Sequence, residues 1–453
     1  MFGDTMAAIS TPMGEGGIGM VRLSGPDAIL VADRVFRSPR GAPLSSQPSH
    51  TIHYGHVVVD DEVVDEVLVS VLRAPRTYTR EDVVEFGCHG GIAAVRAVLD
   101  AVLGAGARLA ERGEFTQRAF LNGRISLDQA QAVLDIVRAQ TALGLEAAVD
   151  RLGGRFSNEV ASLRTTLEAL LADLEVGIDF PDLDVNVDEF LPRVRALAEQ
   201  TAQLRARGEQ GRVVREGLTV TIIGRPNVGK STLLNALLSE ERSIVAPTPG
   251  TTRDTVEEVA SIGGIPVRLI DTAGLRAPAD EVDAEGVRRA EAATKRADLV
   301  LLLLDRSVAL EDDDRELLQR DWGVPTIVVR NKSDLRDDLG GSALPGTAID
   351  TLDVSARDGQ GLLELRERIL GLLVSGGVPS RNTVLLLDTW ERDLLRRLAD
   401  ALDRATAAFE SGATADIAAE ELRAALHAAG ELQGVDLSES ILEQIFSRFC
   451  VGK

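Results

Sequence analysis

Apolar residues recur along the chain with two periods, and the change of period divides the sequence. Up to about residue 118, short apolar runs such as Val67–Leu72 alternate with glycine turns, which predicts strands mixed with helices. A helical stripe follows, breaks at Asp179-Phe180-Pro181, and is succeeded by a helix over about 190–210. Helical periodicity returns near Leu385 and continues to the end. The first stripe consists of Leu163, Leu167, Leu170, Leu171 and Leu174.

Between the two helical regions, short runs rich in branched apolar residues predict buried strands. The first, Thr219–Ile223, turns through glycine into a helix. The turn places Gly224, Gly229 and Lys230 at the spacing of a phosphate-binding loop, in which backbone N–H groups and the ammonium contact the phosphates. The next residue, Ser231, offers a hydroxyl to Mg²⁺. The nucleotide contacts predicted here are Asn227, Val228, Gly229, Lys230, Ser231 and Thr232.

A later strand, Val324–Val329, leads into the sequence N-K-S-D, which predicts guanine as the base. The carboxylate of Asp334 can accept hydrogen bonds from guanine N1–H and from its exocyclic amine, whereas adenine would leave that acceptor unpaired. Asn331 and Lys332 are expected to brace the loops and cover the ring. After the strand-like Leu352–Val354, Ser355 and Ala356 fit the loop that contacts the guanine oxygen.

Two intervening segments have the pattern of GTPase switch regions. Thr252 is placed to give Mg²⁺ a second hydroxyl, together with Ser231. Asp271, Thr272, Ala273 and Gly274 follow a strand, and the Gly274 amide is expected to contact the γ-phosphate. The next residue is Leu275 rather than the water-orienting glutamine of Ras, so we expect a carboxylate within 280–285 to position the attacking water.

These patterns together predict a multidomain α/β and α protein. We expect an α+β domain over 1–118 and an all-α domain made of two segments, 119–216 and 376–453. The Ras-like α/β domain over 217–375 is then inserted between the two helical segments, which is tolerated when the termini of an inserted domain lie close together.

The final residues, F-S-R-F-C-V-G-K, follow a predicted terminal helix. Asp436–Glu439 fits a helix start, and Ile441, Ile445 and Phe449 then recur at helical spacing, so we expect this segment to be docked. Cys450 lies beyond the docked helix. A terminal cysteine is more often inert, because thiol chemistry needs exposure and a lowered pKa.

Composition limits the remaining possibilities. Lys and Arg number 49 against 71 Asp and Glu, so the net charge is −22, which argues against broad nucleic-acid affinity and favours local basic patches or a partner subunit. Two cysteines exclude a disulfide scaffold. Neither a secretory leader nor an apolar run near ~18 residues is found, so we expect a cytoplasmic protein without a membrane anchor.

Over essentially its whole length the sequence resembles the bacterial tRNA-modification GTPases of the MnmE (TrmE) family. The similarity rests on several motifs in family order, including a terminal F-C-V-G-K. These motifs lie at 16–25, 81–91, 113–124, 224–231 and 449–453. The resemblance implies a K⁺-stimulated GTPase that works with the FAD-containing partner MnmG on C5 of the wobble uridine of certain tRNAs. It installs an aminomethyl-type (carboxymethylaminomethyl) group there.

The resemblance also implies a folate site and a homodimer, both formed by the N-terminal domain. The carbon would come from 5,10-methylenetetrahydrofolate, for which 5-formyltetrahydrofolate is an analogue. The matching folate positions are Arg22, Glu85, Arg124 and Lys453, where Arg124 replaces a frequent lysine and supplies a cation for the glutamate tail. The family's functional terminal cysteine corresponds to Cys450, and its chemical role stays open.

For hydrolysis, the resemblance implies K⁺ in place of an arginine finger once two GTPase domains pair. The K⁺ positions would be Asn227, Ala246, Thr248 and Thr251, the last three in a loop that closes over the ion. The family's water-orienting glutamate corresponds to Asp283, which is one methylene shorter, so Glu281 or Glu285 could substitute. Smaller departures are Arg80 in place of a usual glycine and Ser126 in place of a usual aspartate.

A different function with the same GTPase motifs is a ribosome-assembly GTPase of the Era or Der type. Such proteins carry an RNA-binding KH-type module after the GTPase domain. Here a helical segment and the terminal motif follow the domain, and about 216 residues precede it. The tRNA-modification function is therefore favoured.

Overall fold

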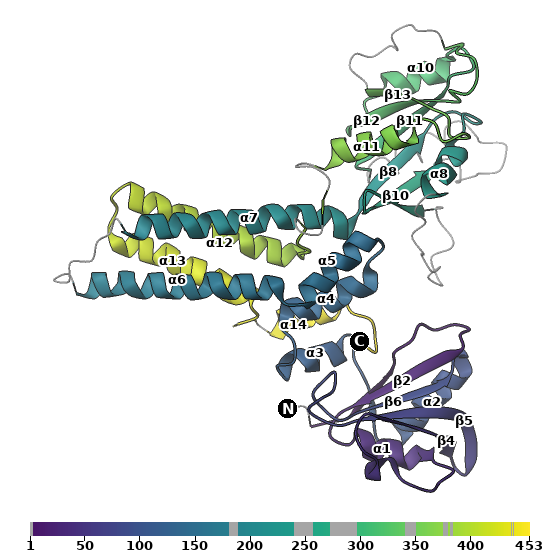
Figure 1. The fold of residues 1–453 in the computed structure, drawn as a ribbon, viewed down its shortest axis with the longest axis vertical. Helices are drawn as coiled ribbons and strands as arrows, with labels where there is room; N and C mark the ends of the chain where they lie inside the picture. Colours follow the sequence, from purple (N-terminus) through teal and green to yellow (C-terminus); the bar gives the residue numbers. More distant parts are fainter. Residues whose placement is uncertain are drawn as a thin grey trace. The chain divides into compact units, whose positions relative to one another are not determined.

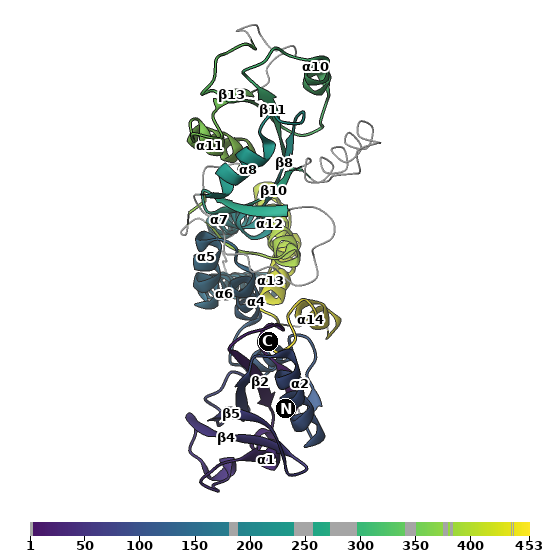
Figure 2. The same ribbon diagram turned by 90° about the vertical axis from the view of Figure 1, so that its right-hand side faces the viewer.

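The computed structural model divides the chain into two units, which are described separately below. The described residues are 3–180, 189–239, 257–271, 297–339, 350–374, 379–380, 384–435, 437 and 439–453. The first unit comprises Met1–Leu134, Ser157–Ser162 and Ala429–Lys453, and the second comprises Asp135–Phe156 and Leu163–Ala428. Figures 1 and 2 show the course of the chain in two views.

The first unit is organised around a mixed sheet with strand order β3-β4-β5-β6-β2-β1-β7. Its strands are β1 Met6–Ile9, β2 Ile18–Ser24, β3 Phe36–Arg37, β4 Thr51–Val59, β5 Glu62–Leu72, β6 Val83–His89 and β7 Arg108–Leu109. The predicted strand Val67–Leu72 lies within β5. Helices α1, Ala28–Val35, and α2, Ile92–Gly104, bury one face of the sheet, and a short 3₁₀ helix covers Leu44–Ser46 (Figure 1).

Among the described residues of this unit, the opposite face of the sheet is covered at one end only. There Phe115 of α3, Glu114–Leu121, packs with Met6 and Ala8 of β1. Farther along the same face, Ile52, Tyr54 and Leu68 are exposed, and Tyr54 pairs directly with Leu68 across β4 and β5. An apolar sheet face without cover is unusual in a monomer and indicates an interaction surface.

The terminal helix α14, Glu439–Phe446, also belongs to the first unit. The expected docking is confirmed for Ile445 and Phe449, which are buried together with Phe446. The prediction was wrong for Ile441, which is 38% exposed, because α14 directs Ile445 and Phe446 to the protein while Ile441 lies near solvent. Phe446 contacts the rings of Phe120 and Phe449 at 6.4 and 5.4 Å between centroids.

Long helices make up the part of the chain that flanks the nucleotide-binding sequence motifs. They are α4 Leu127–Arg138, α5 Ala142–Leu152, α6 Arg155–Asp179, α7 Phe190–Glu216, α12 Thr389–Glu410 and α13 Ala415–Leu432. The predicted leucine stripe of α6 is buried, and α6 ends at Asp179 as predicted. In the described part of the chain, no helix is long and apolar enough to cross a bilayer.

Two helix boundaries differ from the sequence prediction. Helix α7 continues to Glu216, six residues beyond the expected end, and stops at Gly217, whose φ of 76° favours glycine. Helix α12 begins at Thr389 rather than near Leu385. The preceding run Val384–Leu387 is buried without regular secondary structure, and Asp388 and Glu391 then form a capping box that starts the helix.

A buried ion-pair network joins the helices before and after the insertion. Arg151 of α5 contacts Asp135 of α4 at 3.0 Å and Glu391 of α12 at 2.5 Å. Arg215, near the end of α7, contacts Asp135 at 2.8 Å and pairs with Asp388. The network thus ties α4, α5, α7 and α12 together where the chain leaves the helical part and returns to it.

A second sheet, in the second unit, has strand order β13-β12-β11-β8-β10-β9. Its strands are β8 Leu218–Ile223, β9 Glu257–Ile262, β10 Ile265–Asp271, β11 Leu299–Asp305, β12 Thr326–Asn331 and β13 Asp350–Val354. All neighbours pair in parallel except β9 with β10. Helices α8 Lys230–Ser239, α10 Asp312–Gln319 and α11 Leu362–Leu373 accompany the sheet (Figure 1). The carboxyl ends of its parallel strands carry the polar motifs, as expected for an α/β nucleotide-binding sheet.

Candidate functional sites

The loop between β8 and α8 has a backbone that only glycine allows at two positions. Gly224 and Gly229 have φ of 155° and 101°. A Cβ on Gly224 would lie 2.5 Å from the Leu303 carbonyl oxygen, and one on Gly229 would lie 2.3 Å from Asn331 Nδ2. Asn227 adopts φ 66° in the same turn. Such a loop at a helix N-terminus presents backbone N–H groups to an anion.

Lys230 holds its ammonium inside this loop. Its Nζ donates to the carbonyl oxygens of Gly224 and Arg225 at 2.7 and 2.8 Å, and the side chain is largely buried. Burial lowers the pKa of Lys230, although the charge of Asp271 partly opposes this shift. A bound phosphate would stabilise the charged ammonium of Lys230, so the loop is suited to bind a polyphosphate.

Ser231 and Asp271 bring two oxygen ligands together at the start of α8. Ser231 Oγ donates to Asp271 Oδ2 at 3.0 Å, and Asp271 is buried at the end of β10. A hydroxyl and a carboxylate are the hard oxygen donors that Mg²⁺ prefers, so these residues fit this ion. Thr252, Thr272, Ala273, Gly274 and Asp283 lie outside the described residues. The same holds for Ala246, Thr248 and Thr251, which leaves Asn227, exposed in the turn, as the described member of the expected K⁺ set.

Asn331 braces the predicted guanine loops against the phosphate loop. Its Nδ2 donates to the Val228 carbonyl oxygen at 2.9 Å, and its Oδ1 accepts from the Ala356 amide at 3.0 Å. Asp334 accepts from Ser355 Oγ at 2.8 Å, so the two loops that flank the base position are joined. The structure therefore brings Asn331, Asp334, Ser355 and Ala356 together.

Lys332 follows Asn331 with φ 67° and donates to Asp305 at the end of β11, at 2.5 Å. Burial by itself would raise the pKa of Asp305, but hydrogen bonds from Lys332 and Ser307 outweigh it and keep the pKa below its usual value. The pair fixes the lysine stem where it can cover a base.

Arg225 lies in the phosphate loop and makes contacts that the sequence did not predict. Its Nε donates to Asp314 at 2.8 Å, and it also pairs with Glu311. Glu311 and Asp314 form the capping box of α10. The loop is thereby tied to a helix that follows β11. The only signal in the sequence was the acidic cluster at 311–314, which is typical of a helix start.

Two predicted folate residues of the first unit, Arg22 and Arg124, lie near Tyr78. Arg22 and Glu85 pair at 2.8 Å from opposed positions on β2 and β6, and Arg22 also lies 5.7 Å from the Phe115 ring centroid. Arg124 lies 4.8 Å from the Tyr78 ring centroid and donates to the Tyr78 carbonyl oxygen at 3.1 Å. Burial raises the pKa of Tyr78 despite its hydrogen bond with Thr116 and the nearby charges of Arg124 and Arg22. Tyr78 was not singled out from the sequence, because only the sheet register brings these segments together.

The chain terminus is held against β1 and the turn before α3. Arg112 Nε donates to the Phe449 carbonyl oxygen at 3.0 Å, and Ser10 Oγ donates to that of Gly452 at 3.2 Å. A Cβ on Gly452, which has φ 88°, would lie 2.3 Å from the Ile9 carbonyl oxygen, so glycine is required. Ile9 pairs with Val21, which precedes Arg22 on β2, so Gly452 lies near the strand pair that carries Arg22. Cys450 is exposed in this tail.

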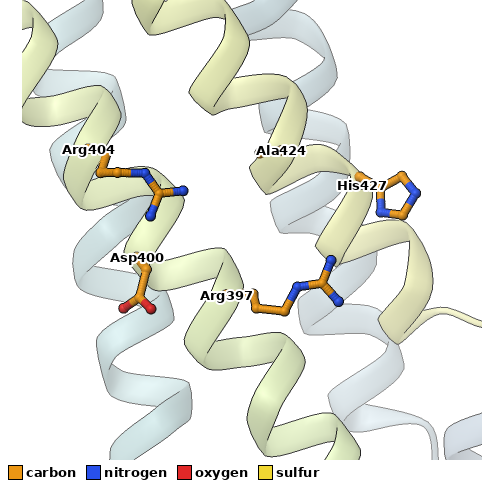
Figure 3. A pocket seen from close by; sticks show the side chains of 5 residues that line it. All are labelled: Arg397, Asp400, Arg404, Ala424 and His427. Atoms are coloured by element: carbon orange, nitrogen blue, oxygen red, sulfur yellow. The ribbon is translucent and has the colours of Figure 1, made fainter.

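A surface pocket of about 330 Å³ lies between α12 and α13, away from any predicted site residue. Figure 3 shows Arg397, Asp400 and Arg404 on one helix, with Ala424 and His427 on the other. Arg404 is engaged by Glu421 at 2.8 Å. The pocket is lined by side chains of both charges, so it has no strong preference for an anion.

The phosphate loop, the Asn331–Asp334 loop and the parallel sheet define a GTP-binding domain of the P-loop class, and the protein is a GTPase. The family described as the MnmE helical domain matches residues 127–450, and the family described as the GTP-binding protein TrmE N-terminus matches residues 5–124. The chain belongs to the MnmE family of tRNA modification GTPases. These matches also confirm the predicted fold class of a multidomain α/β and α protein.

Relatives match over nearly the whole chain. The tRNA modification GTPase MnmE of Geobacillus kaustophilus is 46% identical, with 99% of each chain covered. That of Chloroflexus aurantiacus is 47% identical, with 99% of this chain and 100% of the relative covered. Among solved structures, an Aquifex aeolicus Era variant bound to GDP·AlF4⁻ matches with a TM-score of 0.28 and 30% identity, over 42% of this chain and 66% of that chain.

Proposed function

We propose that this GTPase acts with the flavoprotein MnmG to install a carboxymethylaminomethyl-type group on C5 of the wobble uridine of certain tRNAs. A folate one-carbon unit would supply the carbon, and the FAD of MnmG would supply redox chemistry. The observation that carries the proposal is the arrangement of Arg22, Glu85, Arg124 and the chain terminus around one end of the first unit's sheet. We assign the cytoplasm, where tRNA is modified, as its compartment.

The one-carbon site is proposed to combine polar and aromatic groups. The Arg22–Glu85 pair offers both a donor and an acceptor to a pterin-like ring, while Phe115 and Tyr78 provide aromatic surface beside the two arginines. Arg124 would bind a glutamyl carboxylate, and Lys453 would add a cation from the tail. Residues 1–118 would then form the folate-binding and dimerisation domain, with helical segments at 119–216 and 376–453 and the GTPase domain at 217–375.

Homodimer formation is proposed to use the open face of the first unit's sheet. Ile52, Tyr54 and Leu68 form an exposed apolar surface on β4 and β5. Ser70 continues this face and pairs with Glu85, so the surface runs directly to the Arg22–Glu85 pair. A second copy packed here would bury the apolar side chains and enclose the folate position, which supports a shared site at the interface.

For GTP hydrolysis, we propose that Lys230 binds the β and γ oxygens while the loop amides bind the remaining phosphate oxygens. Mg²⁺ would be held by Ser231 and Thr252 with Asp271 nearby, and would neutralise phosphate charge. Asp283 is proposed to orient the attacking water. The segment of Thr272, Ala273 and Gly274 is proposed to contact the γ-phosphate. Of these groups, Lys230, Ser231 and Asp271 lie together in the described structure.

K⁺ is proposed to replace an arginine finger, bound by Asn227 together with Ala246, Thr248 and Thr251. A fixed cation near the phosphates stabilises the charge that develops in the transition state. We expect the hydrolysis rate to rise by roughly 10-fold or more in K⁺ over Na⁺ at equal ionic strength. Phosphate release measured in the two salts tests this, and the Asn227→Ala variant should lose the difference. Equal rates in both salts for the wild type would remove K⁺ from the mechanism.

Cys450 is proposed to act in the modification reaction and not in GTP hydrolysis. The Cys450→Ser variant should hydrolyse GTP at the wild-type rate and lose tRNA modification, because the thiol is exposed in the tail and outside the nucleotide loops. Cys88→Ser is the matched control: its thiol is buried and donates to the Gly19 carbonyl oxygen, and burial raises its pKa to about 11. Normal modification by Cys450→Ser would contradict the assignment.

The proposed function is tested by mass spectrometry of tRNA nucleosides from cells that lack this gene, with and without a restored wild-type copy. Loss of the 5-substituted wobble uridine and its rescue would support the proposal. A Lys230→Ala copy should fail to rescue, which would link the modification to GTP. Unchanged tRNA together with accumulating ribosome precursors would instead indicate an assembly GTPase of the Era or Der type.

A further inference from the structure

Two arginines, Arg80 and Arg124, lie on loops beside the proposed folate site. Arg80 and Arg124 are exposed, and among the described residues no carboxylate forms an ion pair with either. In the same unit, Arg22 and Arg118 each pair with a glutamate.

The two arginines are held by reciprocal contacts between two loops. Arg80 Nη1 donates to the Asn122 carbonyl oxygen at 3.0 Å, and Arg124 Nη1 donates to that of Tyr78 at 3.1 Å. Asn122 Nδ2 in turn donates to the Thr79 carbonyl oxygen at 2.6 Å. A guanidinium has five N–H donors, so each arginine keeps most of its donors for a ligand. The loops therefore fix the cations without neutralising them.

The backbone at Arg80 gives an independent indication. Arg80 has φ 60°, a left-handed conformation that side chains other than glycine adopt at an energetic cost. Nothing in the turn itself requires an arginine there, since a glycine would fit without strain. Backbone strain of this kind is concentrated at ligand-binding positions.

The nearest acidic side chains in sequence are already engaged. Glu81 is buried and contacts Arg118 and Ser24, Glu85 contacts Arg22, and Asp82 accepts from the Ala74 amide. The loops 78–80 and 122–124 thus present net positive charge next to the proposed folate position. An anion that reaches this place from the folate site meets two guanidinium groups, which match carboxylates in shape and charge.

We propose that Arg80 and Arg124 form a subsite for the successive carboxylates of an oligo-γ-glutamyl tail, so that this protein prefers folates with several glutamates. The inference rests on the proposed folate function. Arg124, over the Tyr78 ring, binds the first glutamyl unit, and Arg80, on the other loop, binds a later one. Each further glutamyl unit adds one carboxylate, and because the tail is tethered to a bound folate, even weak exposed ion pairs add affinity.

The test is the affinity of the purified full-length protein for 5-formyltetrahydrofolate carrying one, three or five glutamates, measured by calorimetry. The wild type should bind the triglutamate roughly 3- to 10-fold more tightly than the monoglutamate, with the advantage shrinking at high salt. Arg80→Gln should abolish this advantage and keep monoglutamate binding. Arg80→Gly, which relieves the positive φ, should have the same effect on binding without loss of stability.

Arg96→Gln is the matched control, because Arg96 lies on α2, which covers the sheet face opposite to Arg22. It should retain the preference for long tails. Equal affinity of the wild type for all tail lengths would overturn the inference and leave the folate proposal intact, whereas no binding of any folate would overturn both. A loss of tRNA affinity in Arg80→Gln with tail preference retained would assign the arginines to tRNA phosphates and also overturn the inference.

Discussion

Replacing Asp334 with asparagine is expected to weaken GTP binding by roughly 10³-fold or more and to create affinity for xanthosine triphosphate. The carboxylate accepts from two guanine donors, N1–H and the exocyclic amine, whereas an amide offers one acceptor and turns a donor toward the amine. Xanthine carries a carbonyl oxygen in place of that amine, so the new donor finds a partner. Equilibrium titration with both nucleotides measures the change.

The variant should preserve the fold of the loop, which makes the result interpretable. Ser355 Oγ donates to Asp334 Oδ1 at 2.8 Å, and the amide oxygen of asparagine can accept the same bond. Asp338→Asn is the control: this aspartate is exposed in the same loop and pairs at 3.3 Å with exposed Arg336. It should leave GTP affinity within a few-fold of wild type. If Asp334→Asn binds GTP as tightly as Asp338→Asn, Asp334 does not contact the base.

The nucleotide loops could be predicted from the sequence because each motif places its residues within a few positions along the chain. Gly229 and Asn331 illustrate the part that needed the structure. The sequence indicates that position 229 needs glycine for its backbone conformation. The structure adds that a Cβ at this position would collide with Nδ2 of Asn331, which lies about a hundred positions away in the chain. Such contacts depend on strand order, which brings β8 and β12 to the two sides of β11.

The start of α12 shows why a boundary could be misjudged. Val384–Leu387 is a continuous apolar run, and a run of this length fits a buried extended segment and a helix equally well. The capping box at Asp388 and Glu391 and the ion pair of Asp388 with Arg215 decide the outcome. Tyr78 and Arg112 were missed for a related reason, since their partners come from distant segments.

The buried network at the insertion point is expected to be the largest single electrostatic contribution to the stability of the helical part. Arg151, Asp135 and Glu391 are each at most 5% exposed. Arg151→Met should lower the free energy of unfolding by about 3–5 kcal/mol, because the buried carboxylate of Glu391 would lose its 2.5 Å contact with the guanidinium. The carboxylate of Asp135 would lose less stabilisation, because Arg215 still contacts it at 2.8 Å.

Hydrogen exchange of α4, α5 and α12 at increasing urea concentration would measure this loss, because a chain with several domains does not unfold in two states. Arg404→Met is the matched control: Arg404 pairs with Glu421 at 2.8 Å but is 56% exposed, so the cost should be about 0–1 kcal/mol. Adding Glu391→Gln to Arg151→Met removes the buried negative charge and should recover part of the stability. An equal cost for Arg151→Met and Arg404→Met would show that burial does not strengthen the network.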